Sequence, residues 1–188
     1  MKAILDFWFG NLEDPDYGQP RQVWFKKDPS FDETVRSQFL EHYHLAAASK
    51  LDNWQETPEG CLALILLLDQ FPRNMFRAKA QAFATDPKAR AIAEYAIAHQ
   101  FDLQMLPVQR LFIYIPFEHS ENIEHQQRAI DLLNQLKHEP YSANFIDYAL
   151  RHFRVIERFG RFPHRNQILG RETTPEEAEF LKQPGSSF

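Results

Sequence analysis

Four side chains that carry charge or exchange a proton lie within eight residues of the sequence: Glu118, His119, Glu121 and His125. If residues 117–137 form one helix, a step of about 100° per residue places Glu118, Glu121 and His125 on its apolar face. A buried carboxylate must be paired, hydrogen-bonded or protonated, because burying a bare charge is very costly. The spacing therefore indicates a functional site. The alternative is structural, since first-turn glutamates stabilise the start of a helix and a single histidine can be a core residue.

Two segments of the sequence supply positively charged partners for these glutamates. Each follows a predicted helix and contains a Phe-Pro step with an arginine and an asparagine after it, at residues 71–74 (FPRN) and 162–166 (FPHRN). The proline stiffens the turn, while the arginine and the asparagine supply directed donors for a carboxylate or a phosphate. The sequence leaves open the alternative that these arginines pair with Asp69, Glu118 and Glu121 in a structural ion network.

The candidate site residues come from these segments. Asp69 ends an apolar helix, where its charge opposes the helix dipole, so Arg73 or Arg77 is expected beside it. Desolvation can raise the pKa of a buried glutamate toward neutrality, which suits acid–base catalysis. The candidates for a catalytic acid or base are Glu118, Glu121 and His164. The candidate ligand-binding residues are Asp69, Gln70, Arg73, Asn74, Arg110, His119, His125, Arg165 and Asn166.

Three functions fit these residues. A cleft lined by Glu, His, Arg and Asn suits a small anionic or zwitterionic ligand, which is the partner the sequence favours. The protein acts on that ligand in the second case, although neither a nucleophile elbow nor a phosphate-binding glycine loop indicates a reaction class. In the third case the chain is an interaction module whose groove recognises a peptide, and the polar cluster is a structural ion network.

Metal ions and cofactors are not expected. Glu121 and His125 are four residues apart, a spacing that allows both to bind one metal ion on a helix. A di-iron site in a helical bundle needs the Glu-x-x-His pattern on two helices, and this pattern is absent from the cluster. The second set of ligands is therefore missing.

Composition and charge limit the class of protein. The net charge is -5, and no basic run is long enough to follow a phosphate backbone, so nucleic acid is not expected as a partner. The apolar run Cys61–Leu68 is far shorter than the roughly 20 residues that span a bilayer. The first residues do not have the pattern of a signal peptide. We expect a cytoplasmic protein without a membrane partner, for which a protein partner stays possible.

Helix signals recur along the chain, whereas alternating β-branched runs are missing. An amphipathic helix is expected from about Phe31 to Ser49, and Pro107 begins another. The expected helix caps are Thr57, Asp86 and Ser142, with a capping box at Thr174 and Glu177 and a stop at Gly160. The prediction is an all-α fold of seven to nine helices, in a single domain over residues 1–183 with a flexible tail at 184–188.

Four ordered motifs carry a resemblance to a known family. The segments LDQFPRNMFR, AFATDPKAR, PFEHSE and RFGRFPHRNQILGRETTPEE are similar to those of a bacterial family of uncharacterised proteins, domain of unknown function 924. The resemblance runs from ILDFWFG to EEAEFL, and Ala78 stands where the family usually has glycine. It implies one helical domain of antiparallel hairpins, similar to tetratricopeptide repeats, and it implies no activity.

Overall fold

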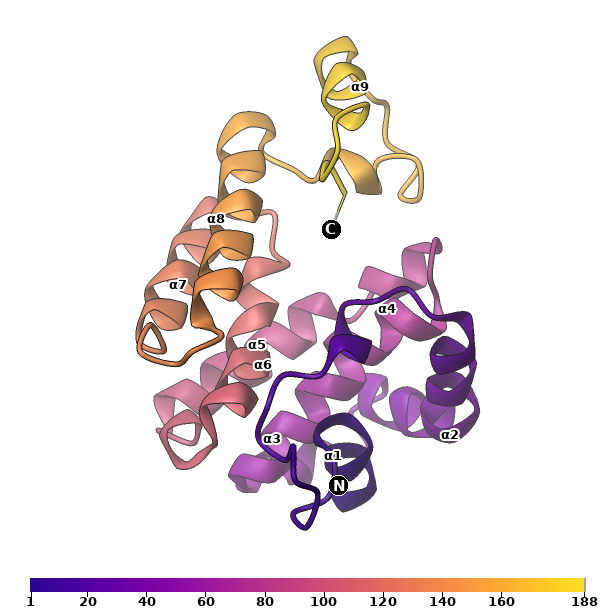
Figure 1. The fold of residues 1–188 in the computed structure, drawn as a ribbon. Coiled ribbons are helices and arrows are strands. Elements are labelled where there is room, and N and C mark those ends of the chain that lie inside the picture. Colours follow the sequence, from indigo (N-terminus) through magenta and orange to yellow (C-terminus); the bar gives the residue numbers. More distant parts are fainter. Residues whose placement is uncertain (188) are drawn as a thin grey trace. The chain divides into compact units, whose positions relative to one another are not determined.

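The structure of the protein, a computed structural model, describes residues 1–187, which form helices joined by turns and loops and contain no β-strand. Figure 1 shows the α-helices in chain order. Their bounds are α1 Lys2–Phe9, α2 Pro29–Ala47, α3 Pro58–Ile65, α4 Phe71–Met75, α5 Asp86–Ala98, α6 Pro107–Glu118, α7 Ile123–Asn134, α8 Ser142–Phe159 and α9 Pro175–Leu181. The shorter turns are η1 Gln22–Trp24, η2 Asp52–Glu56, η3 Leu66–Gln70, η4 Ala80–Phe83, η5 Asp102–Gln104 and η6 Pro163–Arg165. This confirms the predicted all-α class and helix number over the described residues.

The chain divides into two compact units. The first contains Met1–Arg77 and Gln81–Pro116, and the second contains Ala78–Ala80 and the chain from Phe117 onward. The division falls within α6, directly after Pro116, which lies inside the helix and has no N–H to donate. The single domain over 1–183 and the flexible tail at 184–188 stay predictions, and residue 188 of that tail lies outside the described residues.

The core of the first unit is built around α3 and the turn that continues it. Every residue from Cys61 to Leu68 is fully buried. Thr57 caps α3 as predicted, because its Oγ1 accepts a hydrogen bond from the Gly60 N–H at 3.1 Å. Gly60 is needed there, since a Cβ at this position would lie 1.9 Å from the carbonyl oxygen of Trp54. The start of the central helix is therefore fixed by its local sequence.

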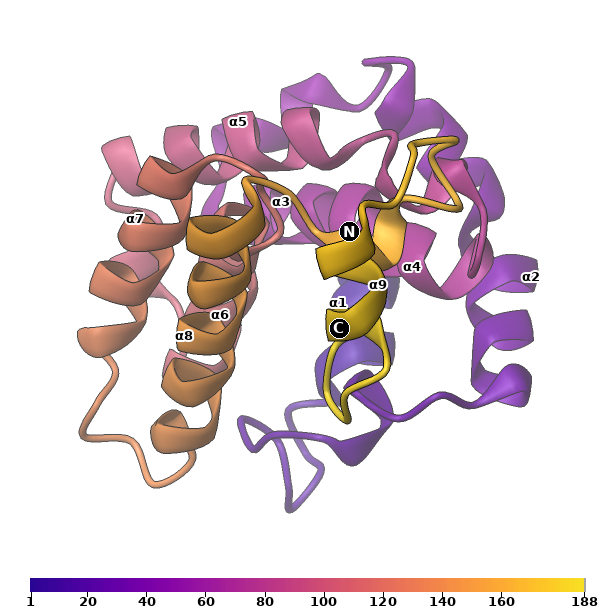
Figure 2. The ribbon, with the colours of Figure 1, turned by 90° about the horizontal axis from the view of Figure 1, so that it is seen from above.

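The second unit is organised by α7 and α8. Figures 1 and 2 show these two helices side by side, and the short connection between them makes the pair antiparallel. This arrangement is compatible with the hairpin packing of tetratricopeptide repeats, which stays a prediction. Gly160 ends α8 in the left-handed conformation, at φ 66°, as the sequence predicts. The predicted capping box of Thr174 and Glu177 is confirmed at the start of α9.

Two of the predicted caps are wrong. Asp86 is the first residue of α5 and does not cap it, because the Arg73 guanidinium binds its carboxylate at 2.8 and 2.9 Å. Ser142 is the first residue of α8, and its hydroxyl donates to the Glu139 carbonyl at 2.8 Å. In both cases the polar side chain is used by a group outside the helix that it was expected to cap.

Candidate functional site

The predicted single helix over residues 117–137 does not form. Glu118 is the last residue of α6, and α7 begins at Ile123. Asn122 caps α7, because its Oδ1 accepts hydrogen bonds from the N–H groups of Glu124 at 2.7 Å and His125 at 3.3 Å. The interpretation of Glu118 and Glu121 as first-turn acids is therefore also wrong. The buried position predicted for Glu118 is nevertheless confirmed, since 5% of this residue is exposed.

Glu118 contacts a histidine from the opposite helix of the second unit. The Oε1 atom of Glu118 lies 3.1 Å from Nδ1 of His152, which projects from α8. The same nitrogen lies 2.9 Å from the carbonyl oxygen of Tyr148, one turn earlier. His152 is 2% exposed and is therefore a core residue. Local sequence patterns do not indicate which carboxylate lies beside His152.

The environment of His152 disfavours its charged form. Burial is the largest cause that lowers the pKa of His152 well below its usual value. The hydrogen bond with the Tyr148 carbonyl opposes this effect, and electrostatic interactions with His119, Arg165 and His164 add to it. The neutral imidazole is therefore the form present at neutral pH. Burial also raises the pKa of the Tyr148 hydroxyl, and the charge of Glu118 adds to that effect.

A buried aromatic ring connects the remaining members of this group. Phe162 is fully buried, and its ring centroid lies 5.4 Å from that of His152 and 5.6 Å from that of His164. The Arg165 guanidinium lies over the same ring, 4.3 Å from the centroid. Arg165 also donates from Nη1 to the carbonyl oxygen of His119 at 3.0 Å. The ring thus holds charged and titratable groups from α8, η6 and the α6–α7 turn in one place.

We call this group the histidine cluster. Its members are Glu118, His119, Tyr148, His152, His164 and Arg165. Glu118, His152 and Arg165 are buried, whereas His119 and His164 are partly exposed and Tyr148 is 42% exposed. The cluster therefore has a buried interior and a side that solvent reaches.

Glu121, the second predicted catalytic glutamate, is held in a different arrangement. Arg171 binds both of its carboxylate oxygens, at 2.7 and 3.0 Å, and the backbone N–H of Phe162 donates to Oε1 at 2.8 Å. Burial alone would raise the pKa of Glu121, but the hydrogen bonds from Arg171 and Phe162 outweigh it and lower the pKa. Glu121 is thus an ionised group that fixes the loop around Phe162.

Asn166 belongs to the same structural network. Its side-chain amide donates to Glu177 Oε2 at 3.1 Å, and its Oδ1 accepts from Arg171 Nε at 3.0 Å. Arg161 donates to both carboxylate oxygens of Glu177, to Oε1 at 2.6 Å and to Oε2 at 2.8 Å. These contacts, with that of Arg161 the largest cause, lower the pKa of Glu177 to about 2. Asn166 therefore anchors α9 to the turn that carries His164 and Arg165.

His125 lies in α7, so it does not share a helix face with Glu118 and Glu121 as the sequence predicted. Its Nδ1 is 2.8 Å from the hydroxyl of Ser120, and its ring meets Phe117 at a centroid distance of 6.3 Å. Over the described residues, no group of three or more His, Cys, Asp or Glu side chains is arranged to hold a metal ion.

The remaining predicted residues lie in the first unit. Asp69 is fully buried in the π-helical turn η3, where Gln70 Nε2 donates to its Oδ2 at 2.6 Å. Arg73 lies 3.4 Å from Asp69, as the dipole argument predicts, and it also makes the two contacts with Asp86 described above. Arg73 thus joins η3 to the start of α5.

Asn74 and Arg110 also make hydrogen bonds within the first unit. Asn74 Nδ2 donates to Asp32 Oδ1 at 2.8 Å. Arg110 Nε donates to the Tyr114 hydroxyl at 3.0 Å, and that hydroxyl donates to Asp102 at 2.7 Å. The predicted residues therefore fall into several separate groups in the two units, and the group that combines buried and partly exposed titratable side chains is the histidine cluster.

Sequence reasoning missed the partners that organise these groups. These partners are Asp32, Asp86, Asp102, Arg161 and Arg171. The contact of His152 with Glu118 and the contact of the capping residue Glu177 with Arg161 were missed as well. The available signal was the surplus of predicted buried carboxylates, each of which needed a donor somewhere in the chain. The number of buried carboxylates does not indicate which arginine pairs with each of them.

Comparisons with known proteins place the chain in a family. A family model described as a bacterial protein of unknown function (DUF924) matches residues 4–185, so the chain belongs to this family, as its motifs predicted. The chain is also similar to the solved structure of the protein of unknown function ATU0120 from Agrobacterium tumefaciens. The two sequences are 45% identical, the match covers 96% of each chain, and the TM-score is 0.85. A comparison with curated proteins finds no match.

One structural property bears on the predicted surroundings of the protein. Over residues 1–187, no helix combines the length and the apolar character needed to cross a membrane.

Proposed function

We propose that the histidine cluster binds a small anionic or zwitterionic molecule. The observation that carries the proposal is the gathering of His119, His164 and Arg165 near His152, which itself contacts the buried carboxylate of Glu118. Arginine and protonated histidine make strong, short hydrogen bonds to carboxylate and phosphate oxygens. The partly exposed members give a ligand access from solvent, and the buried members hold the accessible ones in place.

Acid–base chemistry on the bound molecule is a second part of the proposal. Glu118 and His152 are within hydrogen-bonding distance and buried, which is the arrangement in which a carboxylate and an imidazole share or transfer a proton. His164 lies on the accessible side of the cluster, where it can reach a ligand. Glu121 is not part of this chemistry, because Arg171 and Phe162 already use its carboxylate.

A thermal-shift screen tests the binding. A ligand that binds only the folded protein raises the melting temperature by mass action, by an amount that grows with its concentration. The panel consists of small carboxylates, phosphomonoesters and amino acids at millimolar concentration. A specific hit is expected to lose its effect in His164→Gln and to keep it in Arg154→Gln, which changes an exposed arginine of α8. A panel without any hit, or hits that survive in His164→Gln, would contradict the proposal.

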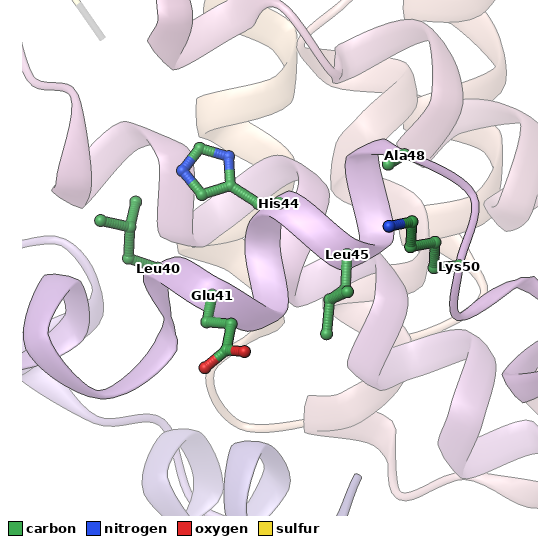
Figure 3. Close-up of a pocket in the computed structure, with 6 residues that line it drawn as sticks. All are labelled: Leu40, Glu41, His44, Leu45, Ala48 and Lys50. Carbon is green, nitrogen blue, oxygen red and sulfur yellow. The ribbon is translucent and has the colours of Figure 1, made fainter.

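A peptide-binding role has one observation in its favour. An open pocket of about 460 Å³ lies along the second half of α2 and is lined by Leu40, Glu41, His44, Leu45, Ala48 and Lys50. Figure 3 shows that these side chains come from one helix and the turn after it, so a peptide docked there would lie along the second half of α2. In this second proposal a protein partner docks on α2, and the histidine cluster is structural.

Selection from a displayed peptide library tests the second proposal. Peptides that dock in the α2 pocket are expected to lose binding in Leu40→Glu and to keep it in Ser37→Glu, which changes an exposed residue of the same helix. Selected peptides that bind both variants equally would contradict docking at this pocket. A cytoplasmic location remains an expectation from the sequence alone.

A further inference from the structure

The three histidines of the histidine cluster differ in their access to water. His152 is 2% exposed and contacts Glu118 and the Tyr148 carbonyl through the same nitrogen. His119 and His164 are partly exposed, and each comes from a turn rather than from a helix interior. A buried imidazole is disfavoured in its charged form, whereas a partly exposed one keeps much of the hydration of its cation. The partly exposed His119 and His164 can therefore take up a proton more readily than the buried His152.

We propose that the ligand of the histidine cluster is an oxyanion whose binding is accompanied by proton uptake at His119 and His164, while His152 positions Glu118. This inference rests on the proposed function, because it concerns the same site. It adds the charge state in which the site is active, the groups that change charge, and the chemical class of the ligand.

The charged groups around the cluster explain the coupling. Arg165 is the member that is positively charged at every ordinary pH, and it lies close enough to His152 to affect its titration. Glu118 at the end of α6 supplies negative charge, and Glu121 beside it is bound by Arg171. Tyr148 on α8 is neutral, because burial raises the pKa of its hydroxyl.

An anion that enters the cluster is therefore attracted by Arg165 and repelled by the negative charge of Glu118. Protonation of His119 and His164 adds positive charge and N–H donors on the accessible side, where the anion enters. By linkage, a site that takes up one proton on binding weakens about tenfold per pH unit above the pKa of the titrating group, which for an ordinary histidine is about 6.5. If two protons are taken up on binding, the same relation predicts that the anion affinity falls by up to about a hundredfold per pH unit.

The role of His152 differs from that of the other two histidines. It is a positioning residue, because its ring packs between Tyr148 and Phe162 while its nitrogen faces the Glu118 carboxylate. Replacing it is expected to weaken anion binding without changing the number of protons taken up. A lower affinity with the same proton uptake would show that His152 positions the site and does not titrate. If His152 had a purely structural role, a folded variant would keep both the anion affinity and the number of protons taken up.

Calorimetric titration with sulfate and with acetate tests the inference. Neither anion titrates between pH 6 and 8, so any proton uptake belongs to the protein. The two anions also distinguish a phosphate-like ligand from a carboxylate ligand. Each titration is run at pH 6, 7 and 8, in two buffers with different ionisation enthalpies, so that the number of protons taken up is measured directly. We expect one to two protons at pH 7.5 and affinity that falls at least tenfold between pH 7 and 8.

Variants assign the protons to individual residues. His119→Gln and His164→Gln are each expected to remove about one proton of uptake. His138→Gln, which changes an exposed histidine elsewhere in the second unit, is expected to change nothing. Affinity that is equal at pH 6 and 8, or uptake that is unchanged in both cluster variants, overturns the inference and leaves the proposed function standing. If neither anion binds at pH 6, the inference fails, whereas the proposed function fails only if the thermal-shift panel also gives no hit.

Discussion

The carboxylate of Glu118 lies 3.1 Å from Nδ1 of His152, and less than a tenth of either side chain is exposed. The contact joins the last residue of α6 to the middle of α8, and the two residues are more than 30 positions apart in the chain. A buried pair of this kind is costly to break and sensitive to protonation. The pair therefore restrains the fold of the second unit, and it is also the buried part of the histidine cluster.

Comparing Glu118→Gln with Glu118→Ala should separate two contributions of Glu118 to stability: the charge of its carboxylate and its hydrogen bond with His152. The glutamine keeps an acceptor for the His152 N–H, so the free energy of unfolding should fall by less than about 1 kcal/mol. The alanine leaves His152 without that acceptor and opens a small cavity, which should cost about 2–4 kcal/mol. Urea unfolding measures both values. Equal losses in the two variants would show that the carboxylate oxygen is not the acceptor inferred from the structure.

His152 should make the protein less stable in mild acid. Its pKa is lowered on folding, so the unfolded chain binds a proton that the folded protein excludes. The corresponding stability is fully present above the unfolded pKa of about 6.5 and is lost as the pH falls toward the lower folded pKa, at up to about 1.4 kcal/mol per pH unit. The free energy of unfolding of His152→Gln between pH 7 and 5 should depend less on pH than that of the native protein. His138→Gln serves as the control, and a parallel change in both variants would refute the assignment.

Arg171→Ala should destabilise the second unit by about 1–3 kcal/mol, because it leaves the partly buried Glu121 without its two-point contact. Arg158→Ala is the matched control, since its pair with Glu176 is exposed and should be worth less than about 0.5 kcal/mol. Thermal and urea unfolding of the two variants make the comparison. A cost of Arg171→Ala as small as that of the control would mean that the Glu121 network does not hold the Phe162 loop.

The first unit should depend on Arg73 in a similar way. Arg73→Lys keeps a positive charge but loses the planar contact with both oxygens of Asp86, so we expect a loss of about 1–2 kcal/mol. Arg73→Ala also leaves the fully buried Asp69 without this partner, and about 3–5 kcal/mol is expected. Lys26→Ala, at an exposed position, is the control. An alanine variant no less stable than the lysine variant would contradict the role of the charge beside Asp69.

The helices were predictable because their signals are local. Thr57 before Pro58, Gly160 after a helix, and the spacing of Thr174 and Glu177 each fix a helix end through atoms a few residues apart. The prediction over residues 117–137 failed for a local reason as well. Its apolar periodicity continues across Asn122, whose capping side chain begins a new helix.

The site was predictable only in part, because its contacts are long-range. The burial of Glu118 followed from the helix pattern, although the pattern was applied to a helix that does not form. The partner of Glu121 lies 50 residues further along the chain, at Arg171, in a loop without a regular pattern. Local spacing identified Glu177 as a cap, yet its contact with Arg161 depends on how the chain folds back.

The most direct test of the central claim is an NMR titration of the imidazole groups with sulfate at pH 6. The chain has eight histidines, so most of them act as controls within one sample. Anion binding at the histidine cluster predicts saturable shifts of His119, His152 and His164, while the exposed His44 and His138 stay unchanged. Cluster resonances that do not move, or shifts of equal size at every histidine, would contradict the claim that this cluster is an anion-binding site.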